Sequence, residues 1–314
     1  MGGHRRREAC VVCGTPADLA VAGPLGLRIC RRCDVAWSQQ DDPRDSAGEW
    51  ERDYYGHDAI LRLHESRRRG MDAIADRLLA VCPKRGKLLD VGAGVGVFMN
   101  AAASRGWEVE GVEPSRTAAE RARQLTGARV HGGLLENMEL PSESYDAVTV
   151  FDTLRHVPEP MRFLDRAARL LRTGGFLLVR EVHRDVVWRL MGLRKRSDQT
   201  AGTPNRAAFE YGQWFSPRSL LFALGSVGLG EAWVEPSPVF AEWQSSGGLL
   251  ASGLKRVFEI ASRAVYGLSG RRVLMSPNLL AFARVTRDRL DGRGVGAVAG
   301  MKMTDRGEGF SGAR

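Results

Sequence analysis

The stretch LLDVGAGVGVF, residues Leu88–Phe98, joins a short apolar run to three alternating glycines, Gly92, Gly94 and Gly96. An apolar run that leads into such a loop and then into helical spacing is typical of a nucleotide-binding α/β domain. The spacing differs from the dinucleotide fingerprint G-x-G-x-x-G/A, because Val97 stands where that fingerprint has a small residue. The chain also lacks G-x-x-x-x-G-K-[ST], which excludes a P-loop.

Two acidic residues near this loop indicate which nucleotide it binds. Asp90 comes just before the glycines, and Glu113 ends the next strand-like run, WEVEGVE. A carboxylate in the position of Glu113 can accept hydrogen bonds from both hydroxyls of an adenosine ribose. S-adenosylmethionine carries an α-ammonium group and no phosphate, so acidic residues beside the loop suit it. The residues therefore favour S-adenosylmethionine over NAD.

The pattern around the loop alternates strands with helices. Ser115 stands where it would cap one of these helices, and we expect Gly174 and Gly175 to end another. Such alternation predicts a parallel sheet with helices on both faces and a ligand at the carboxyl ends of the strands. The expected strands are 87–92, 107–114, 128–133, 145–152 and 176–183, and the expected helices are 95–105, 115–125 and 159–172.

The flanking segments complete this outline. Helical spacing before the glycine loop stops ahead of Pro83, and Ser216 is placed to cap a helix in the second half. Residues 193–214 are polar and predict a loop or a mobile lid. The expected flanking helices are 60–82 and 216–230, and the last two expected strands are 231–238 and 278–285.

An amphipathic segment, residues 246–268, lies between the last two expected strands. We interpret its apolar stripe as a surface that packs on the core or on a twin subunit, with binding to a membrane surface as the alternative. The stripe consists of Leu250, Leu254, Val257, Phe258, Ala261, Val265 and Leu268.

Four of the five cysteines form two pairs near the N-terminus, Cys10-x2-Cys13 and Cys30-x2-Cys33. This spacing predicts a zinc ribbon in which four thiolates surround one Zn²⁺. Four thiolates leave no open coordination position, so the metal is expected to be structural. Cys82 stands alone and is expected to be an inert thiol.

The composition limits the class of protein. The chain has 314 residues, 43% of them hydrophobic, and a formal net charge of +9, which suits an anionic partner or reflects solvated surface arginines. No apolar run is long enough for a transmembrane helix, and no apolar region follows the basic N-terminus as it would in a secretory signal. We therefore expect a cytoplasmic protein.

From about Lys87 to Val182 the chain resembles class I S-adenosylmethionine-dependent methyltransferases. The resemblance rests on LLDVGAGVGVF, VEGVEPS, LPSESYDAVTVFDTLRHVPEP and FLDRAARLLRTGGFLLV. The four-cysteine module, RDYYG and WFSPRSLLFALGSVGLG extend it to methyltransferases of sugar and secondary-metabolite pathways, including zinc-containing sugar C-methyltransferases.

This resemblance implies a Rossmann-like α/β fold whose seven-stranded sheet has an antiparallel last strand, with an N-terminal zinc ribbon. It places Asp90 and the three glycines around the methionine moiety and Glu113 at the ribose. Asp152 is a further candidate cofactor-binding residue. The domains expected are a zinc ribbon at 1–40, a linker and helix at 41–85, a methyltransferase domain at 86–285 with a helical insertion at about 240–275, and a disordered tail at 286–314.

The chain departs from the family pattern where the methyl acceptor and the adenine should lie. Arg155 precedes His156 where relatives have Glu-His, Leu134 replaces an Asp beside the adenine, and Tyr211 replaces a His. Arg155 would recognise a phosphate or carboxylate of the acceptor, or pair with Asp152 or Glu159. The candidate catalytic bases are His156, His183 and Tyr211.

The function expected is methyl transfer from S-adenosylmethionine to a sugar nucleotide, a glycan or a natural-product intermediate. One alternative is an RNA-base methyltransferase that binds nucleic acid through the zinc ribbon and an arginine-rich surface. Against it, the fourth strand is followed by DTLRHVPEP and not by an N/D-P-P-aromatic motif. The other alternative is a non-catalytic protein that retains the cofactor fold. The oligomeric state stays open.

Overall fold

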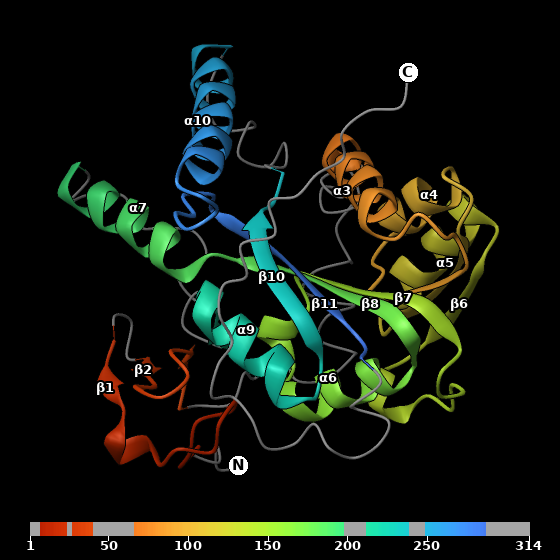
Figure 1. Ribbon diagram of the computed structural model, residues 1–314, viewed down its shortest axis with the longest axis horizontal. Helices are drawn as coiled ribbons and strands as arrows, with labels where there is room; N and C mark the ends of the chain where they lie inside the picture. The colour runs from red at the N-terminus through yellow and green to blue at the C-terminus, as the bar shows by residue number, and fades with distance from the viewer. Residues whose placement is uncertain (1–6, 24–26, 40–65, 198–211, 239–248, 287–314) are drawn as a thin grey trace.

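The computed structural model describes residues 7–23, 27–39, 66–197, 212–238 and 249–286. A large sheet forms its centre, with helices on both faces, and a small sheet built mainly from the N-terminal residues lies beside it (Figure 1). Among the described residues, no helix has the length and apolar content needed to cross a membrane.

The large sheet has seven strands in the order β10-β11-β8-β7-β4-β5-β6. Neighbouring strands from β8 to β6 are parallel, whereas β11 is antiparallel to both β8 and β10. The predicted α/β fold with an antiparallel last strand is therefore confirmed. The strands are β4 Lys87–Val91, β5 Glu108–Glu113, β6 Arg129–Gly132, β7 Tyr145–Phe151, β8 Leu171–Val182, β10 Gly230–Pro236 and β11 Asn278–Arg284.

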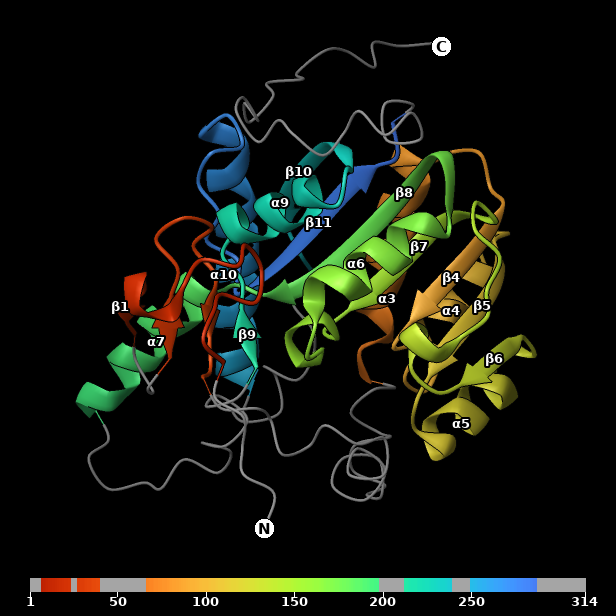
Figure 2. The ribbon, with the colours of Figure 1, turned by 90° about the horizontal axis from the view of Figure 1, so that it is seen from below.

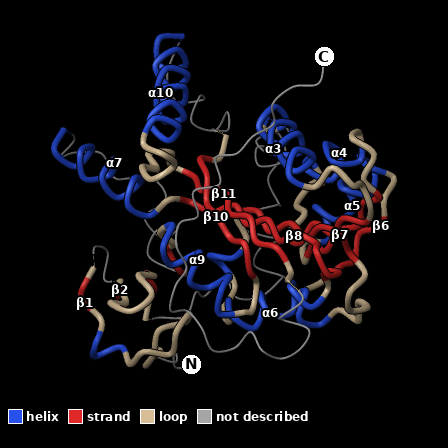
Figure 3. Tube along the Cα trace, viewed as in Figure 1, coloured by secondary structure: helices blue, strands red, loops and turns tan. Residues whose placement is uncertain are grey.

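Helices cover both faces of this sheet, and α7 and α10 extend from its β10–β11 end (Figure 3). Figure 2 looks onto the face that α6 and α9 cover. The side chains of Ser115 and Ser216 cap α5 and α9 as predicted, each accepting a bond from a backbone N–H of the first turn. The helices are α3 Arg68–Val81, α4 Val97–Ala103, α5 Arg116–Thr126, α6 Pro160–Arg169, α7 Arg184–Ser197, α9 Pro217–Ser226 and α10 Leu249–Leu268, with 3₁₀ turns η1 Ala17–Leu19, η4 Leu135–Asn137 and η5 Leu154–His156.

The small sheet joins distant parts of the chain. Its order is β1-β2-β3-β9, and all its described pairings are antiparallel. In the last pairing Ala36 lies opposite Trp214 and Trp37 lies opposite Gln213. The cysteine module is thus extended by a strand from the second half of the chain. Its strands are β1 Val21–Ala22, β2 Arg28–Ile29, β3 Ala36–Trp37 and β9 Gln213–Trp214.

The expected end of the helix before β8 is wrong. Helix α6 ends at Arg169, and β8 begins at Leu171, so Gly174 and Gly175 lie inside the strand. The register between β7 and β8 shifts here, and Gly174 has a φ of +82°. A Cβ on Gly175 would lie 3.0 Å from the carbonyl oxygen of Asp146. The two glycines therefore form a bulge and do not end a helix.

The expected loop at 193–214 is wrong at both ends. Helix α7 continues to Ser197, and Gln213–Trp214 form β9. The pairing of β9 with β3 could not be read from local polarity, because it depends on a partner far away in sequence. The middle of the expected lid, including Tyr211, lies outside the described residues.

The apolar stripe expected on one face of α10 is divided in the structure. Phe258 and Val265 are partly buried, whereas Val257, Ala261 and Leu268 are exposed. Packing on the core of this chain therefore holds for only part of the stripe, and packing on a twin subunit stays a prediction. The side chains of Leu250 and Leu254 lie outside the described residues. The sheet offers the helix only a narrow contact at the ends of β10 and β11, which one side of the helix fills.

Candidate functional site

The parallel strands β4, β5, β7 and β8 all end at one edge of the large sheet. The glycine loop follows β4, Glu113 ends β5, Asp152 follows β7 and His183 follows β8. The topology therefore brings the predicted cofactor-binding residues to one edge, as expected for a ligand site of an open α/β sheet.

The glycine loop takes backbone conformations that other residues rarely adopt. Gly92, Gly94 and Gly96 have φ values of +75°, +54° and +82°. A Cβ on Gly92 would lie 2.2 Å from Oγ1 of Thr153, so the loop lies directly against the segment after β7. A Cβ on Gly96 would lie 2.9 Å from Cα and Cβ of Ala122, so this glycine lets α5 pack against the loop.

Glu113 is held firmly at the end of β5. Its side chain is buried, with Oε2 accepting a hydrogen bond from the Gly94 N–H at 2.8 Å and Oε1 accepting one from the Ser115 N–H at 2.9 Å. Each carboxylate oxygen has two lone pairs, so a carboxylate anchored in this way can still accept bonds from hydroxyl groups. The residue fits the ribose of an adenosine.

Asp90 lies inside β4 with its carboxyl group buried. It accepts a hydrogen bond of 2.6 Å from Oγ1 of Thr149, and burial raises its pKa to about 7. An ammonium group close to Asp90 would favour the charged carboxylate and offset this burial. The environment of Asp90 thus fits the α-ammonium group of S-adenosylmethionine.

Asp152 sits in a left-handed conformation directly after β7, with a φ of +55°. Its Oδ2 pairs with the buried guanidinium of Arg180 and lies 3.7 Å from Nη1 of Arg67. Its Oδ1 is buried and has no hydrogen-bond partner in the described part of the chain. An unmatched buried acceptor is costly, so this oxygen fits a donor group on a ligand.

Arg155 lies between the large sheet and β9. Its backbone N–H donates to Oε1 of the buried Glu181 at 3.2 Å, and its guanidinium carbon lies 4.5 Å from the centre of the Trp214 ring. The two expected carboxylate partners pair with other arginines, Asp152 with Arg180 and Arg67, and Glu159 with Arg162.

The candidate bases differ in setting. His183 is buried, its Nδ1 lies 3.0 Å from the carbonyl oxygen of Ser276, and burial lowers its pKa. His156 ends η5 beside the glycine-loop edge and is partly exposed. Tyr211 lies outside the described residues, and Leu134 is an exposed residue ahead of η4.

Sequence reasoning missed the charged residues inside the sheet. Arg180 and Glu181 are both buried in β8, and Arg180 bridges Asp152 and Oγ of Ser237. Burial lowers the pKa of Arg180 to about 10 and raises that of Glu181 to about 8. Two adjacent ionisable residues in the apolar run FLLVREV were the available signal, because a buried ionisable group needs partners.

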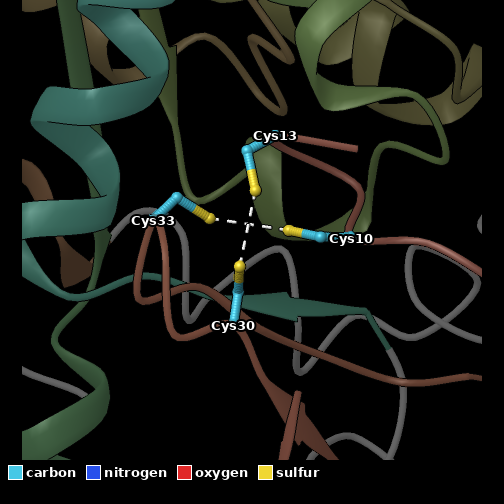
Figure 4. A group of neighbouring side chains, drawn as sticks. All are labelled: Cys10, Cys13, Cys30 and Cys33. Carbon is cyan, nitrogen blue, oxygen red and sulfur yellow. Dashed lines mark hydrogen bonds between the residues drawn. The ribbon is translucent and has the colours of Figure 1, made fainter. Parts of the chain in front are cut away.

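The four cysteines converge as predicted. Figure 4 shows their sulfurs pointing toward one another, with Sγ–Sγ distances of 3.5 Å for Cys10–Cys33 and 3.4 Å for Cys13–Cys30. All four sulfurs lie within 4.8 Å of one another. Zn–S bonds of about 2.3 Å in a tetrahedron separate the sulfurs by about 3.8 Å, so the cluster fits a zinc ion.

The two cysteine turns have the same backbone geometry. Gly14 N–H donates to the Cys10 carbonyl at 3.0 Å, and Asp34 N–H donates to the Cys30 carbonyl at 2.9 Å. The residues Gly14 and Asp34 have similar left-handed φ values of +69° and +66°. Each turn presents two thiolates to one point, and this repeat supports a single metal site.

Comparison with known proteins agrees with this geometry. A family model described as a methyltransferase domain matches residues 63–229, more than half of the chain. The ubiquinone biosynthesis O-methyltransferase of Aliivibrio fischeri is 26% identical over 151 residues, which are 46% of this chain and 64% of that protein. The chain thus spans less than two thirds of the length of this curated relative.

Two solved structures share the fold. A SAM-dependent methyltransferase from Thermotoga maritima matches with a TM-score of 0.50 and 21% identity, covering 75% of this chain and 97% of that one. The plantazolicin methyltransferase BpumL matches with a TM-score of 0.51 and 12% identity, covering 78% and 97%. With the glycine loop, the seven-stranded sheet and the family match in agreement, the chain belongs to the methyltransferase domain family.

Proposed function

We propose that the protein transfers a methyl group from S-adenosylmethionine to a small-molecule acceptor, a sugar nucleotide, a glycan or a natural-product intermediate. The observation that carries the proposal is the anchoring of Glu113 by the glycine loop through Gly94 and by Ser115. This arrangement links the residue suited to the ribose with the loop suited to the methionine moiety. The family match and the O-methyltransferase relative support the same reaction class.

Three acidic residues would bind different parts of the cofactor. Glu113 would hold the ribose hydroxyls, while Asp90 and Oδ1 of Asp152 would receive donors of the methionine moiety. When bound, S-adenosylmethionine supplies a methyl group on a sulfonium, which is already activated for displacement. The protein therefore contributes mainly by orienting the acceptor in line, because correct positioning removes much of the barrier.

The acceptor would lie beside η5. His156 is the best-placed residue to take a proton from a hydroxyl or amine acceptor. Arg155, stacked on Trp214, would offer a cation for a phosphate or carboxylate of that acceptor. The names of the plantazolicin and ubiquinone methyltransferases indicate small-molecule acceptors for those two proteins, which supports this acceptor class.

A structural zinc ion is part of the proposal. Cys10, Cys13, Cys30 and Cys33 would hold it with no open position for a substrate. An RNA acceptor is less well supported, because the ring of Trp37 in the same module is fully buried and offers no surface for base stacking.

Calorimetry with S-adenosylmethionine tests the cofactor assignment. Glu113→Gln should weaken binding by about 1–3 kcal/mol, because a charged acceptor is removed. Glu120→Gln, on the exposed side of α5, is the matched control and should bind as wild type. Absence of binding by the wild-type protein would overturn the proposal.

Turnover is tested separately with pools of sugar nucleotides, glycans and natural-product extracts. Formation of S-adenosylhomocysteine and a product heavier by one methylene group, detected by mass spectrometry, is the expected result. A protein that binds S-adenosylmethionine but methylates nothing in these pools would contradict an enzymatic role and favour a non-catalytic binding protein.

A further inference from the structure

Exposed apolar side chains are concentrated in one short stretch of the chain. Eight large apolar residues are strongly exposed among the described residues, and five of them lie between Val257 and Met275. Val257 is 63% exposed, Ile260 62% and Leu268 90%. Scattered single exposures are normal on a protein surface, but a cluster of this kind marks an interaction site.

The cluster follows one face of α10. Val257, Ile260, Ala264 and Leu268 are spaced by three, four and four residues, which places them on a single stripe of a helix. We call these four residues the α10 stripe. All four are exposed, and Figure 1 shows α10 standing clear of the sheet.

The other side of α10 already has partners in its own chain. The hydroxyl of Tyr266 donates to the carbonyl of Val234 at 2.9 Å, and Ser262 is buried. Phe258 and Ser262 line a narrow crevice together with Pro236 and Pro277. The α10 stripe is therefore a second apolar face that the described residues do not cover.

The charges near the α10 stripe are mainly positive. Arg263, Arg271 and Arg272 are exposed on the helix and on the turn that follows it. Glu259, the only acidic residue of α10, pairs with Arg263 at 3.1 Å. Arg189 adds another exposed cation on α7, which extends from the same end of the sheet (Figure 3).

We propose that the α10 stripe binds the surface of an anionic lipid bilayer. The apolar side chains would enter the boundary between headgroups and acyl chains, while the arginines would pair with lipid phosphates. In sequence, α10 carries three cationic residues, Lys255, Arg256 and Arg263, and one acidic residue, Glu259, and such an excess of cations is typical of a helix that lies in the interface.

Two other occupants fit less well. A second copy of the chain, related by a two-fold axis through α10, would bring Arg263 and Arg271 toward arginines of the same sign. A nucleic acid would match the arginines but would leave the α10 stripe exposed to water. A bilayer is the partner that satisfies both the charge and the apolar surface.

Vesicle sedimentation with the full chain tests the proposal. The protein should sediment with vesicles of phosphatidylcholine mixed with phosphatidylglycerol, and not with vesicles of phosphatidylcholine alone. High salt should release it, because the arginines contribute by charge. The double variant Ile260→Ser, Leu268→Ser should bind at least about tenfold more weakly, because two apolar side chains no longer enter the membrane.

The matched control is Leu125→Ser, which removes an exposed apolar side chain from α5 at the other end of the sheet. This variant should bind vesicles as wild type, and all variants should keep the thermal unfolding temperature of the wild type. Absence of wild-type binding to the anionic vesicles, or equal binding by the double variant, would overturn the proposal. A dimer that dissociates in the double variant, without vesicle binding, would replace it with a contact between two copies.

Discussion

Arg184 and Asp34, separated by 150 positions in the chain, form an ion pair in which one guanidinium nitrogen contacts both carboxylate oxygens. Nη2 of Arg184 lies 3.1 Å from each carboxylate oxygen of Asp34, and Nη1 donates to the Asp34 carbonyl. The Oδ2 atom of Asp34 also accepts a 2.5 Å bond from Oγ of Ser216, the cap of α9. One residue of the second cysteine turn therefore connects the cysteine module to the start of both α7 and α9.

Arg184→Lys should loosen this connection. Lysine keeps the positive charge but cannot bind a carboxylate and a carbonyl with a planar fork, so we expect a loss of about 1–3 kcal/mol in the free energy of unfolding. Urea unfolding measures it. Arg162→Lys, in the exposed pair with Glu159, is the matched control and should change stability by less than about 0.5 kcal/mol. Equal losses of unfolding free energy in the two variants would show that the Arg184–Asp34 contact stabilises the protein no more than an exposed ion pair does.

The metal prediction is tested by counting zinc. Metal analysis of the purified chain should return one zinc per molecule, and Cys30→Ser should lose it and lower the unfolding temperature. The loss follows because binding of a structural metal contributes directly to folding. Cys82→Ser is the control, since Cys82 directly follows α3, is not one of the four clustered cysteines, and its thiol donates a long hydrogen bond of 3.6 Å to the Lys84 carbonyl. Full zinc content in Cys30→Ser would contradict the four-cysteine site.

Elements with local signals were predictable from the sequence. Ser115 and Ser216 cap α5 and α9 because a serine hydroxyl matches the unpaired N–H groups of a first helical turn. The strands β4 and β7 are almost wholly buried and mostly apolar, as parallel strands are when both faces are covered. The location of the candidate cofactor site could be predicted from these strands, because their carboxyl ends lie at one edge of the sheet.

Features that depend on distant contacts were not predictable. Nothing local to Gln213 and Trp214 shows that they pair with β3, and nothing near Asp34 shows that Arg184 binds it. Gly174 and Gly175 were predicted to end a helix because glycine is common both at helix C-termini and in β-bulges. The acceptor side of the site depends on such contacts, so it was the part least open to prediction.

Gly96 in the glycine loop and Gly127 at the end of α5 separate two causes of strain. Gly96 and Gly127 both have left-handed φ values, +82° and +66°, but a Cβ on Gly127 would meet nothing within 4 Å. Gly127→Ala should therefore cost only the backbone penalty of about 1 kcal/mol. Gly96→Ala should cost at least about 1 kcal/mol more, because its Cβ would collide with the backbone of Ala122 in α5.

Thermal and urea unfolding of both variants check this comparison. Gly132→Ala, where φ is not left-handed and no atom lies within 4 Å of the added Cβ, is the neutral reference. If Gly96→Ala were no more destabilised than Gly127→Ala, close packing of α5 against the loop would not be the reason for this glycine.

Glu181 should make the stability of the protein depend on pH. Burial raises its pKa to about 8, above its ordinary value of 4.5, so the folded chain keeps a proton that the unfolded chain releases. Its contribution to stability is thus fully present below about pH 4.5 and is lost as the pH rises through about 8. Asp90, with a pKa raised to about 7, adds a change of the same sign at slightly lower pH.

Glu181→Gln isolates the effect of this one carboxyl group. The amide oxygen can still accept the Arg155 N–H, but the side chain cannot ionise, so the variant should lose less stability than the wild type between about pH 5 and pH 9. Each pKa unit is worth about 1.4 kcal/mol, so the difference between the two profiles should exceed about 1 kcal/mol. Glu159→Gln, at an exposed position, should follow the wild-type profile. Parallel profiles for Glu181→Gln and the wild type would mean that Glu181 is ionised in the folded protein.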